Sequence, residues 1–160
     1  MSAEDAAERR HRSAQRGAQG TARRGILVTL YYLDTSAALK LLAEETHSKA
    51  FAAFYDSHAN ASWVSSALLR VEVMRAVTRV MPVAIPDARD LLLAFDYIGI
   101  DDDIVDAAMN EPDRVLRSLD AIHLATARVL GHELDALVTY DDRLAAAATD
   151  AGFTVTCPRD

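Results

Sequence analysis

The nine residues ILVTLYYLD, numbers 26–34, predict how this chain folds. Residues 26–33 carry no charge and are rich in apolar, β-favouring side chains, as in a strand buried on both faces of a parallel sheet. The run ends at Asp34. Residues 136–141, ALVTYD, show the same arrangement, an apolar strand followed by an acid, here Asp141. The two stretches predict a parallel sheet with a carboxylate just beyond the end of each of these strands.

Strand-like and helix-like stretches alternate from residue 26 to the end of the chain. We expect strands at 26–33, 61–65, 98–100, 136–140 and 153–156, and helices at 35–44, 47–58, 66–80, 86–97, 102–110, 118–131 and 141–150. This alternation predicts an α/β fold, a short parallel sheet flanked by helices on both faces. The 160 residues are enough for one domain with a core and too few for two ordinary ones.

Residues 1–25 differ from the rest, and we expect the folded domain to comprise residues 26–160. The first 25 residues contain no Leu, Ile, Val or Phe and therefore offer nothing to bury, which predicts a disordered tail. Two explanations for the tail remain open. In the first explanation, the tail is a basic arm that contacts nucleic acid or a partner. In the second, the start of the chain was assigned too early and translation begins near Val28.

Charge and cysteine content narrow the class of protein. Residues 1–25 hold six arginines and three acids, so with a total net charge of −7 the remainder carries about −10. Such an acidic body argues against DNA binding by general neutralisation of phosphates, but not against an enzyme that meets phosphate through bound cations. Cys157 is the only cysteine, and neither a membrane span nor a secretory signal is evident. We therefore expect a cytoplasmic protein.

Three acids are predicted to meet at one edge of the sheet. Asp34 and Asp141 each follow a strand, and Asp120 lies in the first turn of the helix predicted at 118–131. In an open parallel sheet the strands end, and the helices begin, at the edge that carries the functional site. Neighbouring carboxylates repel one another unless a cation neutralises them, and oxygen ligands favour Mg²⁺ or Mn²⁺. Such ions polarise phosphates and activate water, so the pattern predicts phosphodiester hydrolysis.

Each acid also has a simpler explanation. Asp34 precedes Thr35 and Ser36 and is a candidate helix cap, and Asp120 would interact well with a helix dipole without any metal. The pair Asp141-Asp142 at a strand-to-helix turn is likewise a common capping arrangement. The common location of these acids, rather than any one of them, favours a metal site.

Glu72 and His123 are two further candidates, each with an alternative explanation. Glu72 lies at the border of the apolar stripe of its predicted helix, where an exposed pair with Arg75 or Arg79 would explain it nearly as well as a catalytic role. His123 lies one turn after Asp120, and a packed histidine on the side of a helix is the favoured interpretation over a metal ligand. Three arginines are candidates to contact phosphates: Arg75, Arg79 and Arg117. The default interpretation of each is a side chain that lies on a solvent-exposed face or pairs with a carboxylate.

Four blocks of sequence, in their order and spacing, resemble a known family. The first block is YLDTSA at 32–37. The second comprises SS at 65–66, VEV at 71–73 and RA at 75–76. The third is RSLDAIHLA at 117–125, and the fourth is VTYDDRL at 138–144. The chain resembles the PIN-domain ribonucleases, and specifically the VapC toxins of bacterial toxin–antitoxin pairs, over roughly residues 32–158. The block at 117–125 is the most specific part of the resemblance.

The resemblance implies a site, an activity and partners. Asp34, Glu72, Asp120 and Asp141 would form an acidic catalytic site for Mg²⁺ or Mn²⁺. Asp34 and Asp120 would be direct metal ligands, whereas Glu72 and Asp141 would act through water or help to activate the nucleophile, with Asp141 also a candidate ligand. The chain would be a metal-dependent endoribonuclease and the toxin of such a pair. It would form a homodimer, and its VapB-like antitoxin would place a C-terminal segment over the acidic groove, which suits the negative charge of the body.

Two departures and several alternatives remain. The tail at 1–25 has no counterpart in the compact family domain, and the doubled Asp141-Asp142 leaves open which carboxylate is the fourth acid. A phosphoacceptor receiver domain or a haloacid-dehalogenase-like phosphatase would need further acids at the first strand and a late lysine, whereas the only lysines are Lys40 and Lys49. A PIN nuclease of RNA maturation, and a PIN-like module that binds without cutting, stay as alternatives. The RNA target is not encoded in any local motif.

Overall fold

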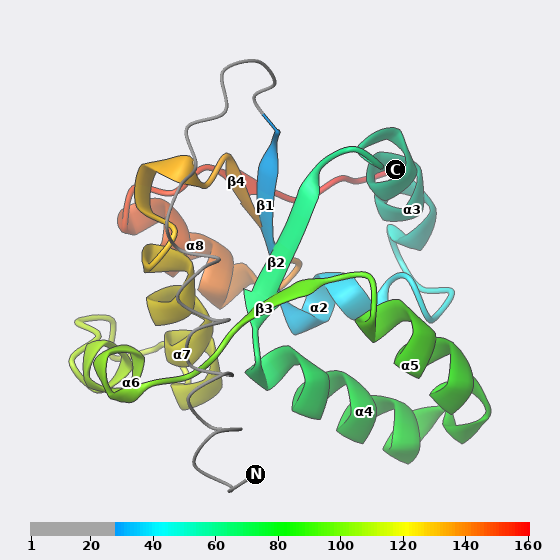
Figure 1. Cartoon of the computed structure of the whole chain (residues 1–160), viewed down its shortest axis with the longest axis horizontal. Coiled ribbons are helices and arrows are strands. Elements are labelled where there is room, and N and C mark those ends of the chain that lie inside the picture. The colour runs from blue at the N-terminus through cyan, green and yellow to red at the C-terminus, as the bar shows by residue number, and fades with distance from the viewer. Residues whose placement is uncertain (1–27) are drawn as a thin grey trace, which may run out of the picture.

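A computed structural model of the chain describes residues 28–160 and contains a five-stranded, fully parallel sheet. The strands lie in the order β3-β2-β1-β4-β5 (Figure 1). Their bounds are β1 Leu30–Leu33, β2 Ser62–Ser66, β3 Asp96–Ile98, β4 Ala136–Val138 and β5 Val155–Thr156. β1 occupies the centre and pairs on one side with β2 and on the other with β4.

Helices cover both faces of this sheet, which gives three layers (Figure 1). One layer is formed by α2 Thr35–Leu39, α3 Ser48–Ser57, α4 Leu68–Val80 and α5 Ile85–Leu92, and the other by α6 Asp102–Met109, α7 Ser118–Arg128 and α8 Asp142–Asp150. The predicted α/β fold, a short parallel sheet between two helical layers, is confirmed. Within residues 28–160, no helix is both long and apolar enough to cross a membrane.

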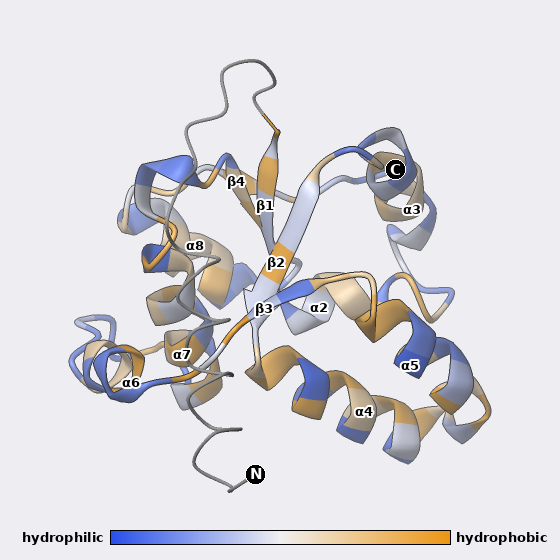
Figure 2. Ribbon diagram, in the orientation of Figure 1, coloured by the Kyte–Doolittle hydropathy of each residue, from blue (hydrophilic) through white to orange (hydrophobic). Residues whose placement is uncertain are grey.

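Side-chain packing divides the core into two clusters, one on each face of the sheet. On one face Leu33 and Val138 pack against Phe51, Leu69 and Val73. On the other face, a second cluster joins the sheet to α7 and α8; its buried members include Tyr32, Leu124, Leu137 and Leu144. Figure 2 shows hydrophobic and hydrophilic residues alternating along α4 and α5, as expected for helices with one buried face.

Some element boundaries differ from the sequence prediction. The helix predicted at 35–44 ends at Leu39, although the following residues favour helix. The chain turns there instead, and Lys40 and Ser48 each hydrogen-bond to a backbone carbonyl of the connection to α3. The helix predicted at 86–97 ends at Leu92, and the strand lies at Asp96–Ile98 rather than 98–100, because Tyr97 pairs with Ser65 of β2. The predictions for residues 1–25, and the first two residues of the predicted strand 26–33, lie outside the described residues.

The order of the strands reverses at the carboxyl ends of β1 and β4. After β1 the chain builds outward through β2 and β3, and it then returns to the other side of β1 to form β4 and β5. In parallel sheets, ligands bind at such a point of reversal, outside the carboxyl ends of the two strands. Asp34 follows β1 and Asp141 lies beyond β4, so the fold brings both acids to this point of reversal.

Candidate active site

Asp34 is buried at the junction of β1 and α2. Its Oδ1 accepts hydrogen bonds from Ser36 Oγ at 2.8 Å and from the Ala37 amide at 3.1 Å, so it caps α2 as the simpler explanation proposed. Only 4% of Asp34 is exposed, and this burial raises the pKa of its carboxyl, although His123 and the hydrogen bond from Ser36 act in the opposite direction. Both of these hydrogen bonds end on Oδ1. The cap therefore does not use Oδ2.

Asp120 lies in the first turn of α7, and its carboxylate is poorly satisfied. Its Oδ2 is buried and has no hydrogen-bond partner among the described residues. Burial raises the pKa of Asp120, Asp141 and Glu72 raise it further, and His123 opposes them. A buried acceptor without a donor is costly, and a carboxylate oxygen of this kind is suited to bind a cation.

The structure distinguishes the two adjacent aspartates at the end of β4. Asp141 is half-buried and caps α8, with its Oδ1 accepting from the amides of Arg143 and Leu144. Asp142 is exposed in the first turn of α8. Asp141 is also the one of the two whose charge acts on Asp120. These observations favour Asp141 as the fourth acid of the site.

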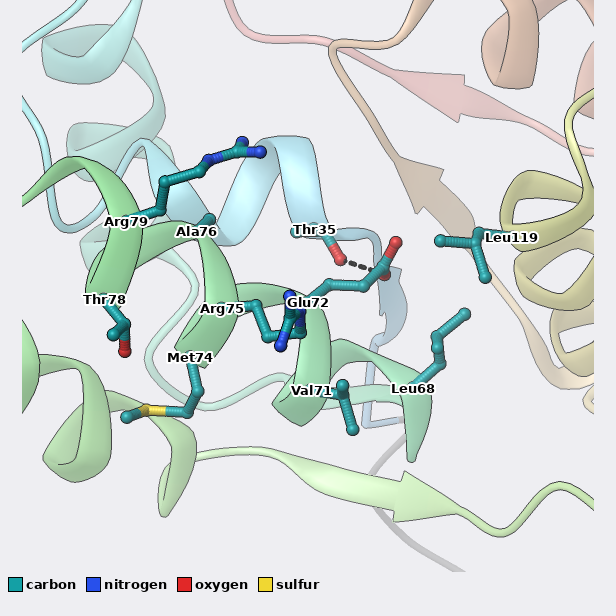
Figure 3. A pocket seen from close by; sticks show the side chains of 10 residues that line it. All are labelled: Thr35, Leu68, Val71, Glu72, Met74, Arg75, Ala76, Thr78, Arg79 and Leu119. Carbon is teal, nitrogen blue, oxygen red and sulfur yellow. Dashed lines mark hydrogen bonds between the residues drawn. The ribbon is translucent and has the colours of Figure 1, made fainter.

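Glu72 reaches the same region from α4. Its Oε2 accepts from Thr35 Oγ1 at 2.5 Å and lies 2.7 Å from His123 Nε2. Burial tends to raise the pKa of Glu72, but the hydrogen bonds from His123 and Thr35 outweigh it and lower the pKa overall. Figure 3 shows the bond to Thr35. An ion pair between Glu72 and Arg75 or Arg79 is absent among the described residues, so that alternative explanation is not supported.

Two hydroxyl residues complete the site: Thr139, which the sequence marks as the hydroxyl residue before the fourth acid, and Ser36, which was not singled out from the sequence. Ser36 Oγ donates to Asp34 and also accepts from the Tyr140 amide, which ties the end of β1 to the segment after β4. Thr139 Oγ1 accepts from the Asp141 amide. The role of Ser36 was not predictable from the sequence, because its contact with Tyr140, 104 positions away, forms only once the strands pair.

A groove of about 740 Å³ runs along α4 beside Glu72 (Figure 3). Its wall is the outer face of α4 from Leu68 to Arg79, and Thr35 and Leu119 close its end near Glu72. Apolar side chains line most of it, and Arg75 and Arg79 add positive charge. The groove thus leads from an apolar and basic surface to one of the four acids.

The donors present fit a hard divalent cation. They are carboxylate oxygens, one of which is buried without a partner, and their mutual repulsion falls when a cation binds. Among residues 28–160, no three His, Cys, Asp or Glu side chains are arranged to hold a metal ion together. The set Asp34, Asp120 and Asp141 therefore stays a prediction, and it suits an ion that keeps several waters, as Mg²⁺ does.

Comparisons with known proteins agree with this fold. The family model described as PIN domain matches residues 31–150. Ribonuclease VapC35 of Mycobacterium tuberculosis is 43% identical over 131 residues, which cover 81% of this chain and 97% of that protein. Ribonuclease VapC46 of the same species is 42% identical over 127 residues, covering 79% of this chain and 96% of the relative.

Solved structures show the same architecture. The crystal structure of Mycobacterium tuberculosis VapC20, described as a Sarcin-Ricin loop cleaving toxin, superposes with a TM-score of 0.64 at 18% identity, covering 78% of this chain and 96% of that chain. VapBC2 from Rickettsia felis, bound to a DNA fragment from its promoter, gives a TM-score of 0.63 at 12% identity, covering 81% and 99%. At these identities the likeness concerns the fold alone. The chain belongs to the PIN-domain family and, within it, to the VapC ribonucleases.

Proposed function

We propose that this VapC ribonuclease is the toxin of a type II toxin–antitoxin pair and hydrolyses RNA phosphodiester bonds with Mg²⁺ or Mn²⁺. The observation that carries the metal-dependent mechanism is the buried, unpartnered Oδ2 of Asp120, whose pKa is raised by burial and by Asp141 and Glu72. An unsatisfied carboxylate among other carboxylates is costly to keep, and strained electrostatics of this kind cluster at functional sites.

The four acids have different proposed roles in catalysis. Asp34 and Asp120 would hold the ion, with Asp141 as a further ligand. When bound, the ion would polarise the scissile phosphate and favour deprotonation of a water. The hydrogen bonds to Oδ1 of Asp34 and Asp141 fix both side chains before any ligand arrives, because each is also a helix cap. Glu72 offers Oε1 to orient the attacking water, since its Oε2 is already occupied by Thr35 and His123.

The groove along α4 is the proposed path of the RNA. Arg75 and Arg79 lie four positions apart on α4, so they share one side of the helix and would contact successive phosphates next to Glu72. The apolar lining, with Leu68 and Leu119 near Glu72, would accept an unstacked base. This arrangement suits a single-stranded loop or bulge better than a regular duplex.

The proposed partners are a VapB-like antitoxin and a second copy of the chain. Solved relatives of this fold include VapBC2 from Rickettsia felis and a toxin-antitoxin complex from Klebsiella pneumoniae. The acidic cluster and the negative charge of residues 26–160 suit a basic antitoxin segment lying over the site. We further propose that the protein acts in the cytoplasm, where the single Cys157 would stay reduced.

Nuclease assays on purified protein test the catalytic residues. A panel of structured RNAs is incubated with Mg²⁺ and the wild-type chain, and with Asp34→Ala and Asp120→Ala variants whose folding is checked by circular dichroism. We expect discrete internal cuts with the wild type and none with either variant. Cleavage by folded variants at the wild-type rate would refute the assigned site, and RNA binding without any cleavage by the wild type would instead support a silent PIN-like module.

Induction in a bacterial host tests the toxin role. Growth arrest that co-expression of an adjacently encoded antitoxin relieves is the expected result. Normal growth of cells that contain active nuclease would refute the toxin assignment.

A further inference from the structure

Beyond the four acids, a buried chain of hydrogen bonds ends on Glu72. Tyr32 of β1 is fully buried, and its hydroxyl lies 2.8 Å from Nδ1 of His123, which is itself only 2% exposed. The other ring nitrogen of His123, Nε2, lies 2.7 Å from Glu72 Oε2. Tyr32, His123 and Glu72 come from three different elements, β1, α7 and α4.

The Ser66 amide favours one direction for the hydrogen bond between Tyr32 and His123. The Tyr32 hydroxyl oxygen accepts from the Ser66 amide at 3.2 Å, so its own proton is free to be donated to His123 Nδ1. A phenol is neutral near neutral pH, so Tyr32 has a proton to donate. A ring nitrogen that accepts a hydrogen bond cannot also carry a proton. With Tyr32 as the donor to Nδ1, the ring proton of a neutral His123 is on Nε2, which donates to Glu72.

The contact at Glu72 has a consequence for the site. Oε2 accepts hydrogen bonds from both Thr35 Oγ1 and His123 Nε2, whereas the described residues donate no hydrogen bond to Oε1. Figure 3 shows Glu72 reaching from α4 toward Thr35 and Leu119, with one carboxylate oxygen on Thr35 and the other away from it. A flexible side chain is thus held by one oxygen and presents the other.

The same contact bridges two helices that otherwise pack elsewhere. α4 packs mainly on α2, α5 and β2, and α7 mainly on α6, α8 and β2. α7 also carries Asp120, three residues before His123. The hydrogen bond from His123 therefore fixes Glu72 of α4 relative to the acid on α7.

We propose that His123, locked in its Nε2–H tautomer by Tyr32, is a positioning residue that aims Glu72 Oε1 at the attacking water. This role rests on the proposed ribonuclease function. It goes beyond packing, because a histidine that only filled space would not require the donor at Nε2. Partners of this kind, one step removed from the reacting groups, typically change activity about 10- to 100-fold when they are lost.

Kinetics of four variants test the proposal. His123→Leu removes the donor, His123→Gln keeps an amide N–H in reach of Glu72, and Tyr32→Phe removes the group that sets the tautomer. Tyr97→Phe is the matched control, since it deletes another, partly buried phenol that donates to a backbone carbonyl, at Leu92, away from the acids. Steady-state cleavage of one RNA and the Tm are measured for each.

The expected pattern separates positioning from a structural role. We expect kcat to fall about 10- to 100-fold in His123→Leu with KM changed less than about twofold, and to recover in part in His123→Gln. Tyr32→Phe should lower kcat more than Tyr97→Phe at a comparable loss of Tm. Unchanged kcat in folded His123→Leu, or equal kcat in the two phenol variants, would overturn the proposal.

A spectroscopic readout tests the tautomer without any substrate. Long-range ¹H–¹⁵N spectra of the ¹⁵N-labelled wild type, with His123 identified by its absence in His123→Gln, should show a ring protonated at Nε2 alone, and a mixture of tautomers in Tyr32→Phe. A ring protonated at Nδ1, or at both nitrogens, would refute the lock. A wild-type protein that cuts no RNA would refute the proposed function itself, which is distinguishable from an active wild type matched by an active His123→Leu.

Discussion

Replacing Asp120 with asparagine should make the protein more stable and inactive at the same time. Oδ2 of Asp120 is a buried acceptor without a donor, and its carboxylate is repelled by Asp141 and Glu72. The asparagine side chain would remove the charge and offer an amide N–H to either neighbouring carboxylate. Most substitutions destabilise, so a stabilising change at a buried polar position would identify a residue kept for function.

The size of the effect follows from the unmet hydrogen bond. Leaving a buried polar group without a partner costs about 1–3 kcal/mol, and more for a charged one. Asp120 is only partly buried and solvent screens its repulsion, so we take the low end, a gain of about 1 kcal/mol. In a domain of this size that corresponds to a rise in Tm of about 2–4 °C.

The gain should depend on pH in a defined direction. Burial and the neighbouring acids raise the pKa of Asp120 above its ordinary value of 3.8, so the ionised carboxylate destabilises the folded state. Below pH 3.8 this carboxyl is protonated in both the folded and the unfolded chain, and the penalty is absent. The difference in Tm between Asp120→Asn and wild type should therefore be largest near neutral pH and shrink as the pH falls toward 3.8.

Thermal unfolding in the presence of a chelator, together with RNA cleavage in Mg²⁺, measures both effects. Asp101→Ala is the matched control, because Asp101 caps α6 through the Ile104 amide, with no part in the acidic cluster. The free energy of unfolding of the control should fall by about 1 kcal/mol, and its rate of RNA cleavage should equal that of the wild type. An Asp120→Asn variant that melts below the wild type at about pH 7, or that still cleaves RNA at the wild-type rate, would refute the reasoning.

Three further predictions concern the groove, the tail and the core. Arg75→Ala and Arg79→Ala should each raise KM while leaving kcat unchanged, and each should reduce the salt dependence of RNA binding by about one phosphate contact, measured by fluorescence anisotropy; an unchanged salt slope would exclude the groove as the RNA path. Deletion of residues 1–25 should leave both Tm and the cleavage rate unchanged, since those residues offer little to bury; a loss of either would contradict the domain boundary. Leu124→Ala should lower the free energy of unfolding by about 2–5 kcal/mol in urea titrations, because Leu124 is fully buried between α7 and the sheet; a loss below about 1 kcal/mol would be inconsistent with that packing.

The order of the strands and helices was predictable because local patterns determine it. The apolar run before Asp34 and the similar run before Asp141 identify parallel strands whatever their neighbours, and the structure places them side by side as β1 and β4. The end of the helix after Asp34 was predicted wrongly, because the turn at Lys40 depends on tertiary hydrogen bonds that local propensity does not contain.

In the site, too, the features set by local sequence were predictable and those set by tertiary contacts were not. Asp34, Asp120 and Asp141 were recognisable because each follows a strand or lies in the first turn of a helix, and the structure also confirms that Asp34 and Asp141 act as caps. The partners of Glu72 were not recognisable. Thr35 and His123 lie 37 and 51 positions away in sequence, and only the packing of three helices around the sheet brings them to one carboxylate oxygen.

The central claim, that these carboxylates cut RNA by means of a divalent ion, is tested most directly by the metal dependence of cleavage. Wild-type protein freed of metal by a chelator is titrated with Mg²⁺ or Mn²⁺, and the initial rate of cleavage of one labelled RNA is followed. The account predicts no cleavage without the ion, a rate that rises to saturation with either ion, and no response in Asp120→Asn. Cleavage at the full rate in excess chelator would contradict it.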